Sequence, residues 1–69
     1  MTKEQFESLK IGDIVEFNNG NDYDYSIMMI TSTMKRTSIY YSYAIQNIVG
    51  NDVANVVTSH CIKFCKKLA

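Results

Sequence analysis

The chain has 69 residues, 46% of them hydrophobic, and a formal net charge of zero. This length predicts a single domain over residues 1–69, and so small a core leaves little volume for the deep pocket of an enzyme. The balanced charge also falls short of the strongly basic footprint of most nucleic-acid-binding domains. We therefore expect a non-enzymatic protein that holds no cofactor.

The charges are nonetheless unevenly distributed along the chain. Residues 1–34 carry six carboxylates and two lysines, whereas residues 35–69 carry five cations and one carboxylate, so the two halves have charges of about −4 and +4. The folded surface is dipolar if the halves stay apart, and the asymmetry cancels if neighbouring strands interleave them. The sequence leaves both outcomes open.

No part of the sequence predicts passage through or into a membrane. No apolar run approaches the ~18 residues of a spanning helix, and the polar start Met1–Glu4 is unlike a signal peptide. In such a chain Cys61 and Cys65 are more often reduced thiols than a disulfide. We expect a cytoplasmic protein.

The N-terminus predicts one short helical turn. Thr2 and Gln5 fit a capping box, in which each side chain satisfies the backbone amide of the other residue. Phe6 and Leu9 then lie three residues apart, on one side of the turn. Gly12 ends this piece.

Alternating residues predict two strands next. In residues 13–17, Val15 and Phe17 share a face that we expect to point into the core. The Asn- and Gly-rich residues 18–22 predict a turn. Residues 23–33 form the second predicted strand, and both of its faces are partly apolar, as in a long strand that bends. Residues 33–37 are then expected to be a polar connection.

The third predicted strand covers residues 38–45, with Ile39, Tyr41, Tyr43 and Ile45 on its inward face. Residues 50–52 predict a turn and residues 53–59 a fourth strand. The last segment reads either as a helix or as a strand with Cys65 facing away from the core. We favour a one-turn break near His60 followed by a short strand.

Residues 9–17, Leu-Lys-Ile-Gly-Asp-Ile-Val-Glu-Phe, resemble the opening of many small SH3-like barrels, where a hydrophobic-Gly-Asp step precedes an alternating strand. The turn, bent second strand and short final strand extend the resemblance over most of the chain. It implies a mainly β fold, a small five-stranded antiparallel barrel with a short N-terminal helical turn, and it leaves function open. Short SH3-like proteins of this composition also resemble phage, prophage or plasmid products.

The residues that might carry chemistry are His60, Cys61 and Cys65. They offer three soft ligands, whereas a closed zinc site needs four. His60 and Cys61 are adjacent, so in a strand they point to opposite faces and make no nucleophile–base pair. We expect neither a metal site nor catalysis.

Tyrosines and cations are the candidate binding residues. Tyr40 and Tyr41 are consecutive, so the inward face assigned above leaves Tyr40 pointing outward, either as an interface aromatic or as a half-buried rim residue. The cations close to Tyr40 lie in the connection before its strand, and the others lie near the C-terminus. The candidate set is Tyr40, Lys35, Arg36, Lys63, Lys66 and Lys67.

These residues favour a protein-interaction module, and the resemblance makes a mobile-element regulator or inhibitor of a host protein its most concrete form. The alternative is a small nucleic-acid-binding barrel that uses the same cations with exposed tyrosine. A third interpretation is an accessory protein whose task is assembly. Another protein is the expected partner, and a homo-oligomer stays open.

Overall fold

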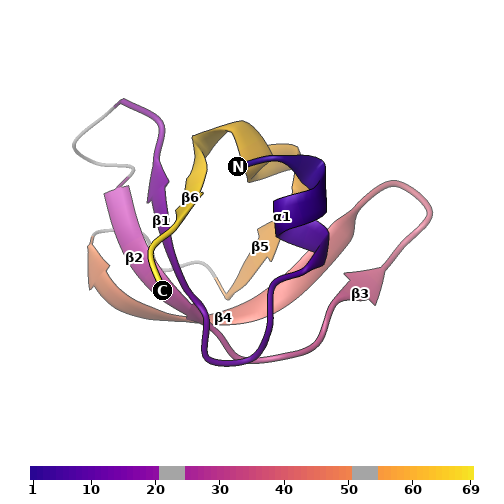
Figure 1. Cartoon of the computed structure of the whole chain (residues 1–69), viewed down its shortest axis with the longest axis horizontal. Helices are drawn as coiled ribbons and strands as arrows, with labels where there is room; N and C mark the ends of the chain where they lie inside the picture. The colour runs from indigo at the N-terminus through magenta and orange to yellow at the C-terminus, as the bar shows by residue number, and fades with distance from the viewer. Residues whose placement is uncertain (21–24, 51–54) are drawn as a thin grey trace.

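In a computed structural model of the chain, the described residues are 1–20, 25–50 and 55–69, and they form six strands, one short α-helix and one 3₁₀-helix. The elements in chain order are α1 (Lys3–Glu7), β1 (Ile14–Asn18), β2 (Tyr25–Ile30), β3 (Lys35–Arg36), β4 (Tyr41–Gly50), β5 (Val56–Thr58), η2 (Ser59–Phe64) and β6 (Cys65–Lys67). The strands curl into a half-barrel (Figure 1).

The long strand β4 organises the sheet, in which every strand pair is antiparallel. The C-terminal half of β4 pairs with β2, which pairs with β1, and β1 pairs with β6. In its N-terminal half, Ser42 has Lys35 of β3 as one neighbour and Thr58 of β5 as the other. A register shift beside Ile27 interrupts the β2–β4 ladder, as at a β-bulge that bends a strand.

The expected small, mainly β antiparallel fold with a short N-terminal helical turn is confirmed. The described strands number six instead of five, because Lys35 and Arg36, which we placed in a connecting loop, form β3 against β4. Two polar residues show no alternation, so only their pairing with Tyr41 and Ser42 reveals the strand. The turn signals at residues 21–22 and 51–52 lie outside the described residues.

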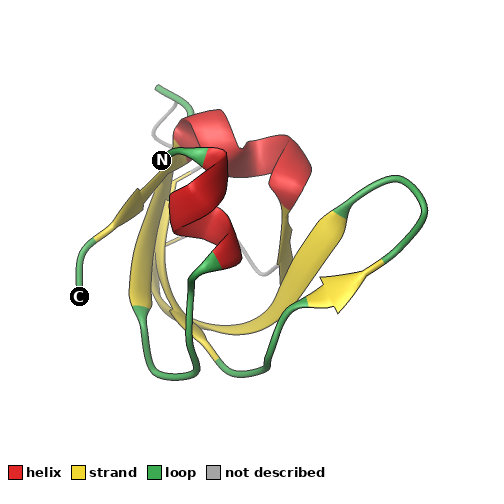
Figure 2. Ribbon diagram, turned by 45° about the vertical axis from the view of Figure 1, so that its right-hand side comes forward, coloured by secondary structure: helices red, strands yellow, loops and turns green. Residues whose placement is uncertain are grey.

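The capping box at the N-terminus is confirmed. The Thr2 hydroxyl accepts a hydrogen bond from the Gln5 amide at 3.1 Å, and the Gln5 side chain accepts one from the Thr2 amide at 2.8 Å. Phe6 and Leu9 are both buried. With η2, helix α1 lies over the concave side of the curled sheet (Figure 2), so the helical turn closes the core that the sheet leaves open.

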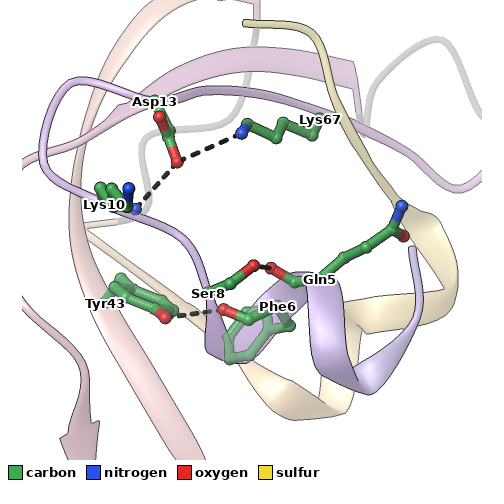
Figure 3. A network of polar contacts seen from close by, with 7 residues as sticks. All are labelled: Gln5, Phe6, Ser8, Lys10, Asp13, Tyr43 and Lys67. Carbon is green, nitrogen blue, oxygen red and sulfur yellow. Dashed lines mark hydrogen bonds and ion pairs between the residues drawn. The ribbon is translucent and has the colours of Figure 1, made fainter.

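The core lies between this helical cover and the sheet. Its buried hydrophobic residues are Phe6, Leu9, Val15, Met28, Ile30, Tyr43, Val57 and Cys65. The Tyr43 hydroxyl donates to the Phe6 carbonyl oxygen at 2.6 Å, and the two rings meet edge to face at 5.1 Å (Figure 3). Val15 is fully buried as expected, and Phe17 packs against the core while partly exposed.

The inward face assigned to the third strand is correct in part. Tyr43 is buried, and Tyr41 and Ile45 pack against the core from partly buried positions. Ile39 is 73% exposed, which contradicts its inward assignment. The reason is that β4 begins at Tyr41, so Ile39 lies in the turn after β3 and outside the alternation of the strand.

The C-terminal segment contains both of the structures that we considered. The break near His60 is the 3₁₀-helix η2, which is followed by the expected short strand β6. The expectation that Cys65 faces away from the core is wrong, because it is only 4% exposed. The strand starts at Cys65, whose partner in β1 is Phe17, and this pairing sets which residues face inward.

Candidate protein-interaction surface

Tyr40 lies in the turn between β3 and β4, not inside a strand. The Thr37 amide donates to the Tyr40 carbonyl oxygen at 2.9 Å, and the Thr37 hydroxyl accepts hydrogen bonds from the Ile39 amide at 3.3 Å and the Tyr40 amide at 3.1 Å. These three hydrogen bonds all involve Thr37 and close the turn on itself. The side chains of Ile39 and Tyr40 are therefore carried on a defined backbone.

The same turn is attached to the start of η2. The Tyr40 ring meets the His60 ring edge to face at 5.5 Å, and His60 Nε2 lies 3.4 Å from the Ile39 carbonyl oxygen. The Tyr41 amide donates to the Ser59 hydroxyl at 3.0 Å. These contacts join residues about twenty positions apart, and no local sequence signal predicts them.

Exposed cations flank this turn. Lys35 and Arg36 are exposed, and the Arg36 guanidinium carbon lies 5.1 Å from the centre of the Tyr41 ring, its partner across the β3–β4 ladder. His60 is exposed and Tyr40 is partly buried. We call this surface the hairpin corner, and its residues are Lys35, Arg36, Ile39, Tyr40, Tyr41 and His60.

The three C-terminal lysines lie around β6 and at the end of η2. Lys66 is the cross-strand partner of Glu16, and Lys67 Nζ lies 3.7 Å from Asp13 Oδ2 (Figure 3). Lys63 Nζ lies 5.0 Å from the centre of the Phe64 ring. The fold thus sets Lys66 and Lys67 beside carboxylates of the first half, so the charge asymmetry of the sequence is offset in part near β1 and β6.

The candidate residues therefore divide into two groups. Lys35, Arg36 and Tyr40 belong to one hairpin, whereas Lys66 and Lys67 lie opposite residues of β1 and Lys63 lies over the Phe64 ring. Residues 25–50 and 55–69 contain no Asp or Glu. In the described part of the chain, the carboxylates are confined to α1, β1 and the segment between them.

A second exposed apolar surface was not singled out from the sequence. On the face of the sheet opposite the core, Ile27 of β2 lies beside Val49 of β4, and Val49 and Val56 are about half exposed. We call this surface the outer sheet face and define it by Ile27, Met29, Val49 and Val56. The apolar residues on both faces of the predicted second strand were the signal for it.

The cysteines differ in their surroundings. Cys61 and Cys65 are free thiols, and burial, followed by the charge of Cys61, raises the pKa of Cys65 from 9.0 to about 11. A thiol in this state is a poor nucleophile at neutral pH, because the thiolate is the reactive form. Within residues 1–20, 25–50 and 55–69, no three His, Cys, Asp or Glu side chains gather as a metal site requires.

The helices of the described segments are too short and too polar for a bilayer crossing. Comparisons with known proteins add neither a family nor a relative: no protein-family model, no curated protein and no solved structure matches this chain.

Proposed function

We propose that this protein is a non-enzymatic interaction module that binds another protein through the hairpin corner. The observation that carries the proposal is Ile39, a large aliphatic side chain held 73% exposed on a tightly bonded turn beside Tyr40. Tyrosine and arginine dominate binding energy at many protein interfaces. A turn that is already ordered loses little conformational entropy when a partner covers it.

The division of the cations supports a protein partner over nucleic acid. Affinity for a phosphate backbone grows with the number of cations that reach it, and at the corner Lys35 and Arg36 are accompanied only by His60. Lys66 and Lys67 lie against residues of β1. The Ile39 side chain has no charge or hydrogen-bond donor for a phosphate, whereas an apolar pocket of a protein partner can enclose this side chain.

We further propose that the chain is an SH3-like barrel of phage, prophage or plasmid type, acting in the cytoplasm as a regulator or inhibitor of a host protein. Support comes from the strand order, in which β1, β2, β4 and β5 pair in succession and β6 returns to β1. This agrees with the bent second strand and short final strand of that family. The genes beside the coding sequence test the origin, and a neighbourhood of housekeeping genes would contradict it.

An affinity pull-down from a cell lysate, with and without nuclease, tests the interaction. We expect a nuclease-resistant partner whose capture is lost with Ile39→Ser and weakened by ~2 kcal/mol with Tyr40→Ala. Lys66→Gln is the matched control, because it removes a cation distant from the corner in the sheet. Nuclease-sensitive capture would instead support the nucleic-acid alternative.

Variants of the outer sheet face provide the result that would contradict binding at the hairpin corner. If Val49→Ser abolishes capture while Ile39→Ser and Tyr40→Ala leave it intact, the partner binds the opposite face of the sheet. Circular dichroism of each variant shows whether it is folded, so that a loss of capture is not a loss of structure.

A further inference from the structure

The hairpin corner carries positive charge that the rest of the described chain does not neutralise. Lys67 and Asp13 form the one ion pair among the described residues, so neither Lys35 nor Arg36 has a carboxylate partner there. Residues 25–50 and 55–69, which include every element that contributes to the corner, contain no acid. A partner that brings carboxylates therefore meets cations that hold no ion pair with another described residue.

Arg36 also has an aromatic contact in the corner. Its guanidinium carbon lies 5.1 Å from the centre of the Tyr41 ring, and the Tyr41 backbone amide donates a hydrogen bond to the Ser59 hydroxyl. A guanidinium in contact with a ring face keeps N–H groups that match the two oxygens of a carboxylate. Stacking on the ring reduces the rotamer freedom that Arg36 would otherwise lose on binding.

The apolar part of the corner narrows the choice of partner. Ile39 and Tyr40 follow Lys35 and Arg36 in the same hairpin, so the surface combines charged and apolar residues. We propose that the hairpin corner binds an acidic segment of its partner protein, one in which Asp or Glu flanks a large aliphatic or aromatic residue. The carboxylate pairs with Arg36, and the apolar residue packs on Ile39 and Tyr40. This inference rests on the proposed function and specifies the chemistry of its partner.

Selection from a random peptide library displayed on a carrier is the direct test. We expect the selected peptides to be enriched in Asp and Glu next to Leu, Ile, Phe or Trp. Selected peptides without enrichment in Asp and Glu would overturn the inference, and so would a selection that yields no binding peptide. Neither result contradicts the proposed function, since the lysate pull-down can still capture a folded partner through Ile39.

Titration of a selected peptide into ¹⁵N-labelled protein then locates the contact. The largest changes in amide chemical shift should occur at residues 35–41 and 59–60. Arg36→Gln should weaken binding by about 10-fold, as for loss of a charge-assisted hydrogen bond, and Arg36→Lys should restore only part of it because the bidentate geometry is lost. Lys66→Gln should change the affinity less than about 2-fold.

Three results would reject the acidic-segment inference. One is a Glu-to-Gln copy of the peptide that binds as tightly as the acidic original. Another is an oligothymidylate that shifts the same amides at lower concentration than the peptide, which would assign the corner to nucleic acid. The last is a set of shifts on Ile27 and Val49 in place of the corner, which would reject the proposed surface as well.

Discussion

A buried hydrogen bond from the Tyr43 hydroxyl to the Phe6 carbonyl oxygen joins β4 to α1. Removing the hydroxyl tests how much this hydrogen bond contributes to stability. Tyr43→Phe deletes the hydroxyl that donates to the Phe6 carbonyl oxygen at 2.6 Å and keeps the edge-to-face ring contact at 5.1 Å. Tyr43 is 1% exposed, so water cannot easily replace the lost donor. The Phe6 carbonyl keeps a longer bond from the Leu9 amide at 3.3 Å, which limits the cost.

The size of the effect follows from these contacts. A net hydrogen bond contributes about 0.5–1.5 kcal/mol, and leaving a buried acceptor poorly satisfied adds up to ~1 kcal/mol. We therefore expect Tyr43→Phe to lower the free energy of unfolding by ~1.5 kcal/mol. A domain of this length has a free energy of unfolding of roughly 3–10 kcal/mol. Each kcal/mol of destabilisation lowers Tm by ~4–8 °C. The melting temperature should fall by about 6–12 °C.

Thermal and urea denaturation followed by circular dichroism measure this change. Tyr25→Phe is the matched control, because its hydroxyl donates to the partly exposed Glu16 carboxylate at 3.1 Å, where water can substitute. Tyr25→Phe should lower the free energy of unfolding by less than ~0.5 kcal/mol. Equal melting temperatures for the two variants would refute the reasoning that burial makes the Tyr43 bond matter.

Three further predictions follow from the backbone and the buried groups. Gly50→Ala should destabilise the fold by more than ~2 kcal/mol in urea denaturation, because Gly50 has φ of +118° and a Cβ there would collide with the Tyr25 carbonyl oxygen and lie 2.6 Å from Ser26 Cα; an unchanged midpoint would contradict the β2–β4 register. With a thiol reagent at pH 8, Cys61 should react first and Cys65 only as the protein opens, since burial raises the pKa of Cys65 to about 11; equal rates would place Cys65 at the surface. At alkaline pH, burial raises the pKa of Tyr43 above 10.0 as well, so the unfolded state loses protons that the folded state retains. Stability should thus be complete below pH ~9 and fall as pH rises toward 11, and a pH-independent urea midpoint over that range would contradict the burial of both groups.

Local chemistry accounts for the parts of the fold that the sequence predicted well. The capping box of Thr2 and Gln5 needs only residues three positions apart, and it forms as expected. Val15 is buried because alternation in a strand assigns its face directly. The change of pattern near His60 likewise comes from the preferences of a few neighbouring residues, and η2 begins there.

The candidate site was predicted in part. Exposed Lys35 and Arg36 do accompany Tyr40, since they are separated by only a few residues of one hairpin. The exposure of Ile39 was missed, because the alternation that assigned it inward holds only within the strand, and the strand starts two residues later. His60 joins the corner through η2, which comes from a different part of the chain.

The sequence alone determined the class of fold and its local elements, because capping, alternation and turn chemistry act between near neighbours. Only the tertiary structure decided which strands pair. Pairing with β4 makes Lys35 and Arg36 a strand, and pairing of Cys65 with Phe17 of β1 directs the Cys65 side chain into the core. It also placed Lys66 opposite Glu16 and Lys67 beside Asp13, and it left the cations of β3 without a carboxylate partner among the described residues. These outcomes depend on residues tens of positions apart, whose proximity is created by the closing of the sheet and is not encoded in any short pattern.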